Sequence, residues 1–224
     1  MTLVIAQKCG PVTWIGSDTR ACTRGGYIYP VPCSKWNRIG DWRVGVTGPG
    51  RIQSLMVLHA EALAKAAIEA RPEFLADALR KAMLDDKWTF DESRNGGPNM
   101  SAAYFLFVSP TLEVYEVAPD GDPTSFGEQF ASIGSASERA DGVAFALANE
   151  HPSTRMLRAI QCAIAQDNNC GGEPYLESLS IKKPVGRCVP RYAGQGGSMD
   201  ISENGPAWTL ASFRREPVDI ADGS

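Results

Sequence analysis

Along this chain, blocks with a strand-like hydrophobic pattern alternate with blocks of helical spacing. The order of these blocks restricts the possible folds more than any other feature. Near the N-terminus, segments rich in β-branched and aromatic residues predict strands over residues 2–7, 12–16, 26–32 and 42–47. Helical spacing then predicts helices over residues 51–70 and 72–88. Further strands are predicted at 102–108, 112–117 and 130–133. Helices at 137–149 and 153–166, the second capped by Ser153, precede a strand at 176–182.

Segregated blocks of strands and helices favour an α+β fold over a parallel sheet built from βαβ units. Most of the 224 residues fit one domain, which we place at residues 1–183. Residues 184–224 are rich in Gly and Pro and contain a single strand candidate at 207–213. We interpret them as a C-terminal extension, partly strand and partly flexible.

Composition excludes several classes of function. A net charge of −4 without any run of Lys and Arg argues against nucleic-acid binding. No apolar stretch reaches the roughly 20 residues that cross a bilayer, and the N-terminus lacks the features of a secretory signal. The six cysteines form no C-x-x-C pair and have no His at zinc spacing. We therefore expect a cytoplasmic protein with reduced thiols, no metal and no cofactor.

A Ser-His-Asp or Cys-His catalytic group is disfavoured, because His59 and His151 are the only histidines in the sequence. Residues 45–50 (GVTGPG) lie between a predicted strand and a predicted helix. They match neither the phosphate loop, which ends in Gly-Lys-Ser/Thr, nor the dinucleotide-binding fingerprint. A tight turn is the better interpretation. The backbone N–H groups at such a helix start still form a good cradle for an anion.

A terminal nucleophile remains available at Thr2, which follows Met1 directly. After removal of Met1, Thr2 would carry its own base, because an α-amino group has a pKa of ~7.7–8.0. A Met-Thr start alone has little weight, since many proteins begin this way.

Several short motifs resemble the proteasome β-subunit and HslV family of N-terminal nucleophile hydrolases. Residues 16–21 (GSDTRA) place Asp18 sixteen positions after Thr2, which is the family's separation for its active-site Asp. Residues 34–39 (SKWNRI) look like the family's lysine segment and supply Lys35. Gly48 matches the family's oxyanion-hole glycine. Residues 133–135 (IGS) and 167–172 (DNNCGG) are similar to two further family motifs, with Cys170 in place of a Ser.

The resemblance implies a four-layer αββα sandwich, in which two antiparallel sheets lie between helix layers. It also implies a role for each matched residue. Asp18 would pair with Lys35 and hold its ammonium near the Thr2 hydroxyl, favouring the alkoxide. Ser135 and Asp167 would orient the terminal amine as the proton shuttle, and the Gly48 N–H would stabilise the oxyanion.

The same resemblance suggests substrates and partners. Cys22 stands where the family has a substrate-binding Thr, while Ala21, Cys33 and Val46 map near its S1 pocket and suggest an uncharged, moderately apolar preference. We expect unfolded polypeptides or peptides as substrates and a homo-oligomeric ring as the assembly. The resemblance does not identify an ATPase unfoldase partner.

The function expected from these residues is that of a threonine-type endopeptidase subunit in a self-compartmentalising, proteasome-like complex. Two alternatives stay open: a non-catalytic structural subunit of the same fold, and an N-terminal nucleophile amidase acting on small molecules. A nucleotide-binding module is a distant third, because no complete phosphate loop exists.

Overall fold

A computed structural model describes residues 3–22, 28–30, 34–88, 103–118 and 122–180. In this part of the chain the strands are β1 (Leu3–Cys9), β2 (Val12–Ser17), β3 (Arg20–Cys22), β4 (Ile28–Pro30), β5 (Trp36–Ile39), β6 (Trp42–Thr47), β7 (Tyr104–Val108), β8 (Val114–Val117), β9 (Thr124–Ser125), β10 (Phe130–Gly134) and β11 (Tyr175–Ser180). The helices are α1 (Arg51–Leu58), α2 (Ala60–Ala67), α3 (Pro72–Asp85), α4 (Ser137–Ala146) and α5 (Pro152–Gln166).

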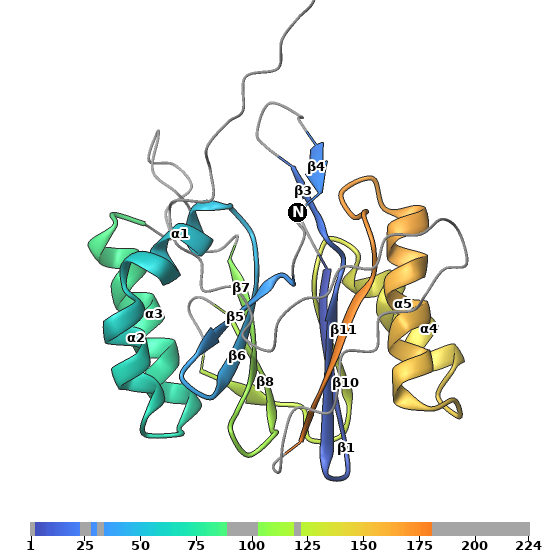
Figure 1. Cartoon of the computed structure of the whole chain (residues 1–224), viewed down its shortest axis with the longest axis horizontal. Coiled ribbons are helices and arrows are strands. Elements are labelled where there is room, and N and C mark those ends of the chain that lie inside the picture. Colours follow the sequence, from blue (N-terminus) through green and yellow to red (C-terminus); the bar gives the residue numbers. More distant parts are fainter. Residues whose placement is uncertain (1–2, 23–27, 31–33, 89–102, 119–121, 181–224) are drawn as a thin grey trace, which may run out of the picture. The chain divides into compact units, whose positions relative to one another are not determined.

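Two antiparallel sheets lie face to face, with a layer of helices on each outer side (Figure 1). One sheet has the strand order β10-β1-β2-β11 and is covered by α4 and α5. The other has the order β5-β6-β7-β8-β9 and is covered by α1, α2 and α3. A separate pair, β3-β4, extends beyond the end of β2. The expected α+β class and αββα layering are confirmed.

Strand β1 explains why the layers hold together. Its residues from Leu3 to Ala6 are completely buried, because neighbouring strands flank it and both of its faces are covered. Alternate side chains point to opposite faces of a strand. Val4 and Ala6 therefore join the cluster between the two sheets, while Leu3 and Ile5 pack against α4 and α5.

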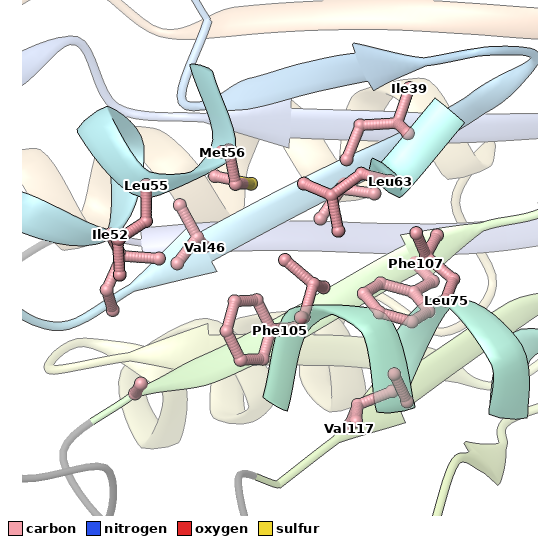
Figure 2. Close-up of a cluster of buried hydrophobic side chains, with 14 of the residues drawn as sticks. Ile39, Val46, Ile52, Leu55, Met56, Leu63, Leu75, Phe105, Phe107 and Val117 are labelled. Carbon is pink, nitrogen blue, oxygen red and sulfur yellow. The ribbon is translucent and has the colours of Figure 1, made fainter. Parts of the chain in front are cut away.

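Helices α1, α2 and α3 pack on the second sheet through one apolar cluster (Figure 2). In α3 the buried residues recur at helical spacing, as Leu75, Leu79 and Met83 illustrate. Val46 on β6 belongs to this cluster and lies beside Ile52, Leu55 and Met56 of α1. The N-terminal end of α1 is thereby fixed to the end of β6.

The structure corrects some of the predicted elements. The single helix predicted over residues 51–70 is divided at His59, whose backbone leaves the helical region at φ −102° and ψ 19°. Strand β5 was not predicted, because Trp36 and Ile39 are its buried residues and they do not alternate with period two. Helix α5 begins at Pro152 with His151 as N-cap, so Ser153 as its cap is wrong.

Two of the predicted segments lie outside the described residues: the extension at 184–224 and its strand at 207–213. Among the helices in the described part of the chain, none combines the length and the apolar character needed to span a membrane. Within the same residues no group of three or more His, Cys, Asp or Glu side chains is placed to hold a metal ion.

Candidate active site

Asp18 lies directly after β2, and its side chain is completely buried. Its Oδ1 accepts a hydrogen bond from the backbone N–H of Leu3 at 2.9 Å and another from Lys35 Nζ at 2.7 Å. Its Oδ2 accepts from the backbone N–H of Gly171 at 3.1 Å and, more weakly, from that of Arg20 at 3.4 Å. A buried carboxylate needs this level of compensation, because burying a charge without partners is costly.

Lys35 lies just before β5, and only 11% of its side chain is exposed. Two neighbouring elements hold its backbone. Its N–H donates to Ser17 Oγ at the end of β2, at 3.2 Å, and its carbonyl accepts from the N–H of Val46 on β6, at 3.4 Å. The ammonium therefore reaches Asp18 from a backbone tied to both sheets.

The start of β1 is the point on which these groups converge. Because Leu3 and Lys35 bind the same oxygen of Asp18, the Lys35 ammonium lies beside the first residue of β1. Thr2 itself lies outside the described residues.

Gly48 follows β6 and has a φ of +122°, which favours glycine over residues with a side chain. It is exposed, and α1 begins three residues later at Arg51, with Gly50 as an N-cap that offers no side chain to the helix N–H groups. The dipole at a helix start favours negative charge nearby.

Ser135 lies directly after β10, where Gly134 pairs with Leu3 of β1. Its Oγ is buried and lies beside the Cys170 thiol, whose pKa it lowers by hydrogen bonding.

Asp167 is buried at the C-terminal end of α5. Its Oδ2 accepts from Arg139 Nη1 at 3.0 Å, and its Oδ1 accepts from the backbone N–H of Asn169 at 2.7 Å. The Asp167 carbonyl accepts from the N–H of Cys170 at 3.0 Å. Asp167 therefore shapes the turn that leads to Cys170 and Gly171.

Cys170 lies among the charged groups of the site. Burial raises the pKa of its thiol from 9.0 to about 12, and the charges of Asp18 and Asp167 act in the same direction. Lys35 opposes this shift. The thiol therefore stays protonated at neutral pH, and it is a packing group rather than a second nucleophile.

The structure describes three of the four predicted substrate-binding residues. Ala21 and Cys22 lie on β3, where Ala21 pairs with Tyr29 and Cys22 with Ile28 of β4. Val46 is only 5% exposed and packs in the cluster under α1. Cys33 lies outside the described residues.

Sequence reasoning missed the backbone donors to Asp18, which come from Leu3 and Gly171. A backbone N–H gives no side-chain signal, so these contacts depend on the fold. It also missed Thr19, although this residue stands inside the GSDTRA motif next to Asp18. The sequence did contain one signal for these contacts, the consecutive glycines Gly171 and Gly172, because glycine allows another part of the chain to approach the backbone closely.

Comparisons with known proteins identify the fold. No protein-family model matches the chain, and no curated protein matches it. Solved structures do: HslV from Trypanosoma brucei aligns with 80% of this chain and 99% of its own, at a TM-score of 0.57 and 19% identity. Thiobacillus denitrificans BPH, in complex with epoxomicin, aligns with 80% of this chain and 98% of its own, at a TM-score of 0.61 and 18% identity.

A third similar structure is an Anbu (Gly-1) mutant from Hyphomicrobium sp. strain MC1, with a TM-score of 0.66 and 14% identity over 85% of this chain and 88% of its own. At these identities the likeness establishes the fold. The chain thus has the sandwich fold of HslV-type and proteasome-type subunits, as the sequence motifs predicted.

Proposed function

We propose that this chain is a threonine-type endopeptidase subunit of a self-compartmentalising complex, and that its nucleophile is the hydroxyl of Thr2 once Thr2 is the N-terminal residue. One observation carries the proposal. The buried Asp18 binds the Lys35 ammonium and the Leu3 N–H through the same oxygen. A fully buried carboxylate thereby brings a cation and the backbone N–H of Leu3, the residue that follows Thr2 in the sequence, to the same atom.

The proposed reaction begins with attack of Thr2 Oγ on the carbonyl carbon of the scissile peptide bond. The Lys35 charge favours the alkoxide, and the α-amino group of Thr2 accepts the hydroxyl proton. Collapse of the tetrahedral intermediate breaks the C–N bond, and the leaving amine takes that proton. Water then attacks the acyl ester, releases the new carboxylate and returns the proton to Thr2 Oγ.

Two further groups are assigned to this cycle. The Gly48 N–H would stabilise the oxyanion, an effect worth ~2.7–4 kcal/mol for one donor in a comparable enzyme. The Ser135 hydroxyl, which is buried at the end of β10 next to the start of β1, would orient the terminal amine. Asp167 would act on the same amine from the turn that it shapes.

The proposed substrates are unfolded polypeptides or peptides with an uncharged, moderately apolar residue before the cleaved bond. Ala21, Cys22, Cys33 and Val46 are the residues assigned to substrate binding. We further propose a homo-oligomeric ring located in the cytoplasm, in line with the fold shared with HslV. No unfoldase partner is assigned.

Turnover of fluorogenic peptides tests the assigned role of Lys35. Lys35→Ala should abolish hydrolysis while the oligomer, measured by size-exclusion chromatography with light scattering, stays intact. Lys81→Ala is the matched control, because Lys81 is an exposed lysine on α3, and it should keep wild-type turnover. Normal turnover in Lys35→Ala would refute the assignment. Absence of turnover in the wild type, with the fold intact, would favour the structural-subunit or small-molecule amidase alternative.

A further inference from the structure

Two segments that are about 150 residues apart in sequence are joined beside the candidate site by hydrogen bonds outside the regular sheets. We call this arrangement the clasp and define it as residues 18–20 together with residues 170–173. Its five bonds are Thr19 N–H to the Gly171 carbonyl (3.1 Å), Gly171 N–H to Asp18 Oδ2 (3.1 Å), Arg20 Nη1 to the Cys170 carbonyl (3.0 Å), Thr19 Oγ1 to the Glu173 carbonyl (2.9 Å) and Glu173 N–H to Thr19 Oγ1 (2.8 Å).

The Thr19 hydroxyl is the only side-chain group of the clasp that acts as both donor and acceptor. It binds the carbonyl and the N–H of the same residue, Glu173, while only 8% of Thr19 is exposed. A hydroxyl with both functions satisfied has a fixed orientation. Thr19 therefore fixes the backbone of residue 173 relative to the end of β2.

Two glycines allow this close approach. A Cβ at Gly172, whose φ is +73°, would lie 2.4 Å from Thr19 Oγ1. A Cβ at Gly171 would lie 2.6 Å from Arg20 Cδ. Non-bonded contacts at these distances are far inside van der Waals separation. The turn rests on Thr19 because residue 172 is a glycine, and Gly171 leaves room for the Arg20 side chain.

The clasp acts on the catalytic groups through Asp18. One carboxylate oxygen binds Leu3 and Lys35, and the other binds Gly171. The Gly171 N–H therefore sets the rotation of the carboxylate, and that rotation sets where the Lys35 ammonium is held. We propose that Thr19 is a positioning residue, which holds Gly171 on Asp18 through its bonds to Glu173 and thereby keeps Lys35 aligned with Thr2. This inference rests on the proposed peptidase function.

Three variants separate positioning from general stability. Thr19→Val keeps the shape of the side chain and removes the hydroxyl, while Thr19→Ser restores it. Thr13→Val is the matched control: Thr13 is also buried, and its hydroxyl donates to the Leu112 carbonyl at 2.6 Å, near the start of β2 and away from Thr19. Both valine variants lose the hydrogen bonding of a buried hydroxyl. Only in Thr19→Val does this loss occur beside Asp18.

Peptide hydrolysis gives the first readout. Thr19→Val should lower kcat by about 10- to 100-fold, with KM close to the wild-type value, because small displacements of catalytic groups have effects of this order. Thr19→Ser should restore most of kcat, and Thr13→Val should leave it unchanged. Equal kcat values for Thr19→Val and Thr13→Val, in an enzyme that requires Lys35, would overturn the inference and leave the proposed function standing.

Crystal structures give a readout that is independent of activity. In Thr19→Val the contacts from Asp18 to Gly171 and to Lys35 should lengthen beyond hydrogen-bond distance, whereas in Thr13→Val they should persist. If the wild type hydrolyses no peptide, the proposed function fails by its own test and the crystal structures decide the positioning role. Unchanged contacts of Asp18 in Thr19→Val would then overturn it.

Discussion

At the scale of single residues, the observed contacts of the candidate site converge on one carboxylate, that of Asp18. Asp18 is fully buried and binds a lysine ammonium together with backbone donors from the start of β1 and from the turn after α5. Buried ion pairs are favourable only when additional hydrogen bonds satisfy both partners. These donors meet that requirement, so burial leaves no uncompensated charge on Asp18.

Residue-level prediction from sequence worked for side chains whose spacing carries information. Asp18 and Lys35 were both predicted, and the structure brings them to 2.7 Å. The Leu3 and Gly171 donors could not be predicted, because any residue supplies a backbone N–H and only the fold decides where it points. Thr19 was overlooked for a related reason: its partners on Glu173 are also backbone groups.

The thiol of Cys170 provides a test at this scale. Its pKa of about 12 and its full burial predict very slow alkylation by iodoacetamide at pH 8, whereas the exposed Cys9 should react quickly. Because folding raises this pKa from 9.0, folding favours the protonated thiol. The contribution of the Cys170 thiol to the free energy of unfolding is complete below pH 9 and is lost as the pH rises toward 12.

Peptide mapping by mass spectrometry after timed labelling measures both rates, and labelling in guanidinium chloride is the control, in which both thiols should react alike. Labelling of Cys170 as fast as Cys9 in the folded protein would contradict the buried, protonated thiol.

At the scale of elements, each helix in the described part of the chain has a predicted counterpart, whereas the short strands β3, β5 and β9 were not predicted. Strand β6 was predicted with the observed bounds because its pattern ends at Gly48 and Pro49. The start of α5 was misplaced because Pro152 occupies the first helical position and His151 Nδ1 accepts from the Ser153 N–H as the cap. Strand β5 is created by pairing with β6, which a local pattern cannot reveal.

Gly45 on β6 tests how closely the two sheets approach. A Cβ at this position would lie 2.6 Å from Val4 Cγ1 on β1, so Gly45→Ala should overpack the space between the sheets and cost ~1–3 kcal/mol of unfolding free energy. Gly142→Ala is the control: Gly142 lies in α4 with open space around it, and alanine there should stabilise by roughly 0.5–1 kcal/mol. Urea unfolding compares the two variants. A Gly45→Ala protein as stable as the wild type would contradict the packing described.

At the scale of the whole molecule, the αββα layering brings distant segments to the start of β1. Asp18 comes from the end of β2, Lys35 from the approach to β5, Ser135 from the end of β10 and Gly171 from the turn after α5. Block periodicity could predict the α+β class, since it separates strands from helices. It could not give the pairing of β1 with β10, because their contacts span about 130 residues of sequence.

The central claim is that Thr2 becomes an N-terminal nucleophile, and intact-mass spectrometry after incubation with epoxomicin tests it most directly. Epoxomicin is the ligand in the structure of BPH, which shares this fold. The account predicts a subunit that has lost Met1 and gained one adduct, which peptide mapping places on Thr2. Thr2→Ser should still form the adduct, and Thr2→Ala should not. A wild-type subunit that retains Met1 and forms no adduct would contradict the claim.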